Sequence, residues 1–139
     1  ALAPADEVIV ITNPEASAVR DADRIIGLVE AEPRKVPISL VINRAKADMI
    51  RKGDMLSVND ILDILSTPLL GVIPEDEQII VSTNKGSPLT LDNQKGPAAE
   101  AFRNIARRIT GAKVPITELE HKKGGFLHRL SRLFRRSGA

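Results

Sequence analysis

The sequence predicts an α/β domain built on a parallel β-sheet flanked by helices, with a separate amphipathic helix at the end of the chain. Three short runs of β-branched and aliphatic residues, nearly free of polar side chains, are typical of strands that helices cover on both faces. Segments with apolar residues at helical spacing alternate with these runs, and the connections are short. A chain of 139 residues is long enough to bury a core of its own.

The first predicted strand, Glu7–Thr12, leads into a helix. Thr12 or Asn13 can cap that helix with a side-chain oxygen, Pro14 suits its first turn, and the acid that follows complements the helix dipole. Apolar residues then recur at helical spacing up to Glu32, where the next residue, a proline, ends the helix.

The second predicted strand, Ile38–Asn43, is followed by a polar, basic stretch that ends at Gly53 and forms a loop or a helical turn. Ser57 then begins a helix that runs to about Leu65. Asp60 stands where a capping box usually has glutamate, so this helix start is predicted to carry reciprocal hydrogen bonds.

The third predicted strand, Leu69–Ile73, is closed by Pro74, and a short helix is expected over residues 75–82. Pro97 opens the last helix of the body, because proline fits the first helical turn. Gly111 ends this helix, since glycine readily adopts the left-handed conformation of a C-terminal cap.

The final segment, residues 126–136, is predicted to be a short basic amphipathic helix. At about 100° per residue its apolar side chains fall within one arc, and its polar side carries arginines and no acid. This pattern is typical of a helix that lies in the plane of a membrane surface, although an ordinary terminal helix packed on the domain is the alternative. The residues expected to contact the membrane are Phe126, Leu127, Arg129, Leu130, Arg132, Leu133 and Phe134. The chain is therefore divided into a body (residues 1–111), a linker (112–125) and this helix.

Composition narrows the function classes. The chain has no Cys, which excludes disulfides and thiolate chemistry and suggests a reducing compartment. No apolar run is long enough to span a bilayer, and no signal peptide is visible at the start. Six of the 20 Lys and Arg residues, and none of the 18 acids, follow residue 120, so residues 1–120 carry a net charge of −4. An acidic body with a basic tail argues against a nucleic-acid-binding surface and for a tail that seeks anions.

The candidate ligand site lies beyond the carboxyl ends of the strands, where parallel sheets bind ligands. This rule selects residues 12–15, 43–44 and 73–76. His121 and His128 lie in the linker and the tail, where they cannot form a triad or a metal cluster, and no catalytic or metal-binding residue is predicted. The phosphate-loop pattern Gly-x-x-x-x-Gly-Lys-Ser/Thr does not occur in the sequence.

Six motifs, in this order and at this spacing, resemble the MinD family of bacterial division-site-selecting ATPases. This family belongs to the deviant Walker A group, which also includes ParA-type partition proteins. The basic tail is similar to the membrane-targeting sequence of that family. The motifs are Asn13–Glu15, Ser17–Ile26, Val41–Arg44, Lys52–Val58, Leu70–Asp76 and Ser82–Gly86. The resemblance implies the C-terminal portion of a P-loop NTPase-like (MinD/ParA) fold.

The resemblance also implies what these residues lack. The N-terminal half of the family carries the phosphate loop and the magnesium ligands, and none of it is present, so the sequence reads as a piece of a longer protein. ATP and Mg²⁺ are therefore expected cofactors of the intact ATPase, and this chain alone is expected to be inactive. By similarity, Asn43 would hydrogen-bond the adenine, because an amide can donate and accept on one base edge; it could also be a plain strand-end turn residue. The residues expected to flank the base are Arg44, Ile73, Pro74 and Asp76, with Glu75 in the same turn.

Partners also follow from the resemblance. Arg20, Asp21 and Asp23 match the helix face that the family uses for a MinC-type septum inhibitor and a MinE-type activator, although they would equally suit a plain solvated face. The family dimerises around ATP and exposes paired tails to an anionic membrane. We therefore expect a homodimer when ATP is bound, a peripheral location on the cytoplasmic side of the cell membrane, and no nucleic acid.

Three other functions compete with this interpretation. A ParA-type partition ATPase that binds DNA would need a basic body, and the body is acidic. A non-enzymatic, membrane-associated adaptor would use the tail without a nucleotide. An RNA-binding basic tail leaves the apolar side of the predicted helix unexplained.

Overall fold

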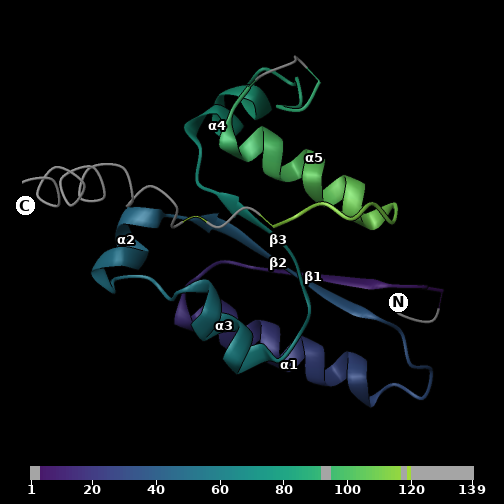
Figure 1. The fold of residues 1–139 in the computed structure, drawn as a ribbon. Helices are drawn as coiled ribbons and strands as arrows, with labels where there is room; N and C mark the ends of the chain where they lie inside the picture. Colours follow the sequence, from purple (N-terminus) through teal and green to yellow (C-terminus); the bar gives the residue numbers. More distant parts are fainter. Residues whose placement is uncertain (1–3, 92–94, 117–118, 120–139) are drawn as a thin grey trace, which may run out of the picture.

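The computed structural model describes residues 4–91, 95–116 and 119. These residues form a three-stranded parallel sheet in the order β1-β2-β3 and five helices (Figure 1). The predicted α/β class is thus confirmed. The predicted amphipathic helix at 126–136 lies outside the described residues. The elements are β1 (Val8–Thr12), α1 (Ala16–Ala31), β2 (Ile38–Ala45), α2 (Ala47–Lys52), α3 (Val58–Leu65), β3 (Leu69–Pro74), α4 (Glu77–Asn84) and α5 (Pro97–Ile109).

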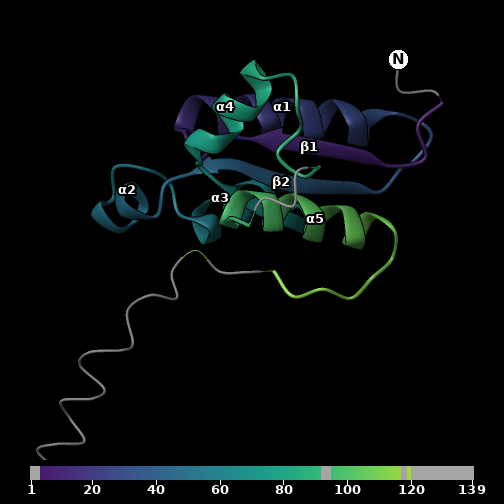
Figure 2. The same cartoon turned by 90° about the horizontal axis from the view of Figure 1, so that it is seen from above.

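Helices cover the two faces of the sheet unequally. α1 and α3 lie on one face, and α4 and α5 lie on the other (Figure 1). The larger core sits beneath the first pair and includes Val10, Leu40 and Ile42, the last two with no exposed surface. The smaller core lies beneath α5 and includes Val41 and Ile73. Seen from above, α5 lies along the β3 side of the sheet and leaves β1 uncovered (Figure 2).

Local sequence signals set two helix ends as expected. The Ser57 hydroxyl accepts a hydrogen bond from the Asp60 N–H at 3.1 Å, and the Ser57 N–H donates to the Asp60 carboxylate at 3.0 Å, so the predicted capping box is confirmed. Gly111 follows α5 with φ +90°, the left-handed conformation expected of the residue after a helix.

The predicted cap of α1 is wrong. The N-cap of the helix is Glu15, and its side chain makes no capping hydrogen bond. Asn13 instead forms a tight turn, in which its carbonyl oxygen accepts from the Glu15 N–H at 2.8 Å. Pro14 is fully buried, and its carbonyl accepts from the Leu56 N–H at 3.2 Å. Packing of Pro14 against the chain before α3 therefore fixes this turn. As a result the helix begins at Ala16, and Pro14 is not part of its first turn.

β2 is longer than predicted, because it continues through Asn43 and Arg44 to Ala45. Its pairing with β3 is regular at Ile42, which lies opposite Val72, and resumes at Ala45 opposite Pro74 after a register shift. Arg44 has φ +57°, a conformation that few non-glycine residues adopt. The two predicted site residues thus lie on an irregular, bulge-like segment inside the strand.

The chain beyond α5 is tied to the body over its first residues. The Arg108 guanidinium donates to the carbonyl oxygens of Leu70 in β3 (2.9 Å), Val114 (2.8 Å) and Pro115. Ile116 and Leu119 then pack against the larger core. The first part of the predicted linker is therefore held along the sheet.

Candidate functional site

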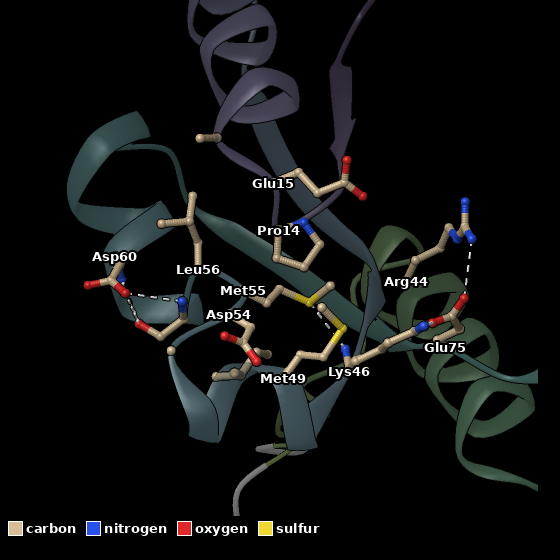
Figure 3. A pocket seen from close by; sticks show the side chains of 14 residues that line it. Pro14, Glu15, Arg44, Lys46, Met49, Asp54, Met55, Leu56, Asp60 and Glu75 are labelled. Carbon is tan, nitrogen blue, oxygen red and sulfur yellow. Dashed lines mark hydrogen bonds and ion pairs between the residues drawn. The ribbon is translucent and has the colours of Figure 1, made fainter.

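The carboxyl ends of all three strands border one open cleft of about 600 Å³ (Figure 3). The turn after β1 contributes Pro14 and Glu15, β2 and the residue after it contribute Arg44 and Lys46, and the chain after β3 contributes Glu75. Parallel strands put their carboxyl ends on the same edge, which is why residues far apart in sequence meet there. The other wall consists of Ala16, Met49, Ile50, Gly53, Asp54, Met55, Leu56, Ser57 and Asp60.

Glu75 bridges two cations at the mouth of this cleft. Its Oε1 lies 3.2 Å from Nη2 of Arg44, and its Oε2 lies 2.8 Å from Nζ of Lys46. The Glu75 side chain is only 27% exposed, and in the described part of the chain its buried Oε2 has the Lys46 ammonium as its only partner. Its N–H also donates to the Ala45 carbonyl at 3.0 Å. One residue after β3 therefore clamps the irregular segment of β2 through both its backbone and its carboxylate.

Asn43 is held by its neighbour. Its Oδ1 accepts from the Arg44 N–H at 3.0 Å, the only hydrogen bond that the structure gives this side chain within the described residues. This local bond fixes the side-chain amide, so that its NH₂ group remains as a donor. Asn43 is half-buried beside the cleft but is not part of its lining.

The other predicted base-flanking residues do not gather at this cleft. Ile73 is 4% exposed and packs in the core beneath α5, so only its backbone can meet a ligand. Pro74 lines a different cleft, of about 370 Å³, between β3 and α5. The Asp76 carboxylate caps α4 by accepting from the Gln78 N–H at 2.9 Å. Of the residues predicted to flank the base, Arg44 and Glu75 line the first cleft, where they form an ion pair.

The far wall of the cleft is rigid where α3 begins. Two hydrogen bonds from Ser57, one from the side chain and one from the backbone, hold the pKa of Asp60 below its ordinary value. Asp60 is therefore a carboxylate at neutral pH and already has its partners. Met49 and Met55 supply soft apolar surface nearby, and the Lys46 N–H points at the Met55 sulfur at 3.5 Å.

Lys46 is a site residue that the sequence analysis missed. It stands two positions after Arg44 and directly follows the end of β2, so both cations lie at the carboxyl end of this strand. Glu75 directly follows the neighbouring strand β3, so the sequence could have suggested an ion pair between this acid and the two cations. The signal was weak because the strand end itself was predicted two residues too early.

The predicted partner-binding residues lie on the solvent side of α1. Arg20, Asp21 and Asp23 are exposed, whereas Val19, Ala22 and Ile26 of the same helix are buried in the larger core. Asp21 forms an ion pair with Arg24, one turn along, at 3.3 Å. These three side chains are therefore available to a partner, but nothing in their geometry distinguishes them from a solvated helix face.

Within residues 4–91, 95–116 and 119, no group of three His, Asp or Glu side chains is placed to hold a metal ion. None of the described helices is long and apolar enough to cross a membrane. The cleft offers cationic and apolar side chains at a sheet edge, a mixture that is common in ligand sites.

Proteins of known role resemble this chain over nearly its whole length. It is 48% identical over 132 residues to septum site-determining protein MinD of Synechocystis, which covers 95% of this chain and 49% of the relative. It is 43% identical over 134 residues to MinD of Bacillus subtilis, which covers 96% of this chain and 50% of the relative. The chain thus spans about half the length of the curated relatives it matches. No protein-family model matches it.

Solved structures give the same result. MinD in the Aquifex aeolicus MinC:MinD complex superposes with a TM-score of 0.80 at 42% identity, over 85% of this chain and 48% of that one. The cell division ATPase MinD of Pyrococcus furiosus superposes with a TM-score of 0.64 at 31% identity, over 76% of this chain and 42% of that chain. MinD of Pyrococcus horikoshii, solved with Mg-ADP, superposes with a TM-score of 0.66 at 28% identity, over 78% of this chain and 45% of that chain. The predicted P-loop NTPase-like (MinD/ParA) fold is confirmed.

Proposed function

Because this chain is a homologue of the septum site-determining MinD proteins over about half of their length, we propose that it forms the C-terminal part of a cell-division ATPase of that family. Its own contribution is to bind the base of the nucleotide, to face a division inhibitor and to reach the membrane. The observation that carries the proposal is the clamped segment around Asn43 at the carboxyl edge of a MinD-like sheet.

The proposed base contact is the Asn43 amide. Its NH₂ group can donate to a ring nitrogen of adenine, and rotation of the amide away from the Arg44 N–H frees its oxygen to accept from the exocyclic amine. The Glu75 clamp holds the segment that presents this amide. The relative solved with Mg-ADP supports a nucleotide ligand.

ATP binding and hydrolysis require groups that these 139 residues do not contain. No phosphate-loop pattern occurs in the sequence, and no metal-binding cluster is found among the described residues. We assign the phosphates and Mg²⁺ to the half of the domain that the relatives possess and this chain does not span. The Pyrococcus furiosus relative is a cell division ATPase, which supports the reaction proposed for the two halves together.

The proposed partners are proteins and a membrane. The Aquifex MinC:MinD complex supports a MinC-type inhibitor, for which Arg20, Asp21 and Asp23 on α1 are the proposed contacts. A MinE-type activator would share this face. The basic tail would bring the protein to the anionic cytoplasmic side of the membrane, and ATP-dependent pairing of two copies would present two tails together.

A chimera tests the nucleotide part of this proposal. This chain would replace the aligned half of Synechocystis MinD, and ATP and GTP affinities would be measured by calorimetry. Asn43→Ala should weaken ATP binding by roughly 30-fold, because two hydrogen bonds of about 1 kcal/mol each are lost. GTP, which presents a different base edge, should be affected less.

The matched control is Asn59→Ala, which removes the same side chain from an exposed position on α3 outside the cleft. Equal losses for the two variants would remove Asn43 from the base site. A chimera that folds but binds no ATP would refute the ATPase proposal. In that case the adaptor function would be favoured, because it needs the tail but no nucleotide.

A further inference from the structure

The cleft at the carboxyl ends of the strands has an apolar wall that the described residues leave half open. Met49, Ile50, Met55 and Leu56 line it from α2 and from the chain before α3, and all four side chains are half-buried. Met49 and Met55 are the two methionines of the chain, and both lie in this cleft (Figure 3). Methionine is flexible and polarizable, so it adapts to apolar partners of irregular shape. This wall therefore suits the apolar side of another segment.

Carboxylates surround the same wall. Glu15, Asp54 and Asp60 line the cleft and are exposed (Figure 3). Among the described residues, no cation forms an ion pair with any of these three. The two cations of the lining both pair with Glu75 instead, so the lining as a whole has four carboxylates, two cations and a net charge of −2. An apolar wall among unpaired carboxylates favours a basic amphipathic partner.

The chain itself carries a segment with these properties. The predicted tail helix, residues 126–136, has two Phe and three Leu on one side. Its other side has four Arg and no acid. A basic amphipathic helix binds an acidic apolar groove through the same side chains that it uses on an anionic membrane.

The described part of the chain ends its course beside this cleft. Leu119 lines the smaller cleft together with Pro74, and the next residue after Pro74 is Glu75, which lines the larger one. Leu119 also packs against the same larger core as Leu56 of the apolar wall. Phe126 follows Leu119 by seven residues, and an extended chain of that length spans about 24 Å. The tail helix therefore starts within reach of the cleft.

We propose that the cleft lined by Met49 and Met55 binds the tail helix of the same chain. The apolar side of the helix lies on the two methionines, and its arginines face Glu15, Asp54 and Asp60. Because the tail is tethered beside the cleft, its effective concentration there is high and a weak contact is enough. The membrane and the cleft then compete for the same tail side chains. The inference goes beyond the proposed function, since it involves neither a nucleotide nor a second half of the domain.

Paramagnetic NMR of the 139-residue chain tests this contact. The sequence has no Cys, so Ser131→Cys places a nitroxide label at one position on the polar side of the tail helix. Methionine labelled at its methyl carbon gives separate signals for Met49 and Met55, and the nitroxide should remove most of the intensity of both. Asp54→Lys should lower the ratio of docked to free tail roughly fivefold, because an attraction becomes a repulsion, and so restore the signals. Glu15→Lys, on the opposite wall, should act in the same way. Anionic vesicles should also restore the signals, by taking up the tail.

Asp63→Lys is the matched control, because Asp63 is an exposed acid on α3 outside the cleft lining. It makes the same charge change and should leave the loss of signal as it is. Equal restoration by Asp54→Lys and Asp63→Lys would overturn the proposal, since net charge alone would then explain the effect. Methionine signals that the nitroxide leaves intact would also overturn it. So would signal loss when nitroxide and labelled methionine are on different copies of the chain, or vesicles that sediment the chain without restoring the signals.

Discussion

At Gly71, α5 lies so close to the sheet that a side chain would not fit. A Cβ built there would lie 2.4 Å from Cγ1 and 2.7 Å from Cδ1 of Ile105, and 3.4 Å from a nitrogen of Arg108. Real carbon contacts do not reach 2.4 Å, so the helix would have to move. The missing side chain thus permits both the packing of α5 and the reach of Arg108 to the Leu70 carbonyl.

We expect Gly71→Ala to lower the free energy of unfolding by about 1–3 kcal/mol, the usual cost of overpacking a core. Urea unfolding followed by circular dichroism would measure it. Gly27→Ala is the control, because a Cβ at this site in α1 would meet nothing within 4 Å. That variant should gain roughly 0.5–1 kcal/mol, since alanine suits a helix interior better than glycine. A Gly71→Ala protein as stable as the wild type would contradict the packing argument.

Single residues also mark the limit of what the sequence predicts. The capping box at Ser57 and Asp60 was predictable because both partners lie within one turn. The left-handed Arg44 was not, because Glu75, which clamps it, is 31 residues away. Ile73 could be placed on a strand, but its burial under α5 depends on which face that helix covers. Local hydrogen bonds were therefore predictable, whereas side-chain destinations across the sheet were not.

At the scale of elements, the segment after α5 differs most from the polar linker that its composition predicts. Composition predicts a polar linker from residue 112, and the structure ties residues 114–116 to β3 and to the larger core. One long side chain, Arg108, makes these connections from the last turn of α5. Because Ile116 and Leu119 border the cleft that also contains Pro74, the segment runs back toward the carboxyl edge of the sheet. The basic tail therefore follows a segment that leads to the edge where the candidate site lies.

Arg108→Ala should release this segment. With three carbonyl hydrogen bonds lost, we expect trypsin to cleave after the exposed Lys113 on the order of tenfold faster, because proteolysis follows local opening. Timed digestion with mass spectrometry would give the rate. Arg107→Ala removes the same charge from an exposed position in the same turn and should leave cleavage unchanged. Identical rates for the two variants would show that Arg108 does not hold the segment.

At the scale of the whole molecule, the acidic residues 1–120 and the basic tail respond oppositely to an anionic membrane. Residues 1–120 carry a net charge of −4, so an anionic membrane repels them, and only the basic tail supplies attraction. On the proposed function, pairing of two copies would double the number of tails at the membrane without new contacts.

The tail itself makes the last prediction. A basic residue near an anionic leaflet gains on the order of 1 kcal/mol, and each shallowly inserted apolar side chain adds about as much. A helix of about 12 residues is marginal in water and must order on binding, so one tail should bind weakly and reversibly. Leu130→Glu should abolish sedimentation of the 139-residue chain with anionic vesicles, because it places a charge among the predicted apolar residues. Ser131→Glu adds the same charge on the predicted polar side and should only weaken sedimentation, by roughly fivefold. If both variants lose binding to the same extent, charge alone drives the contact, and the in-plane helix is wrong.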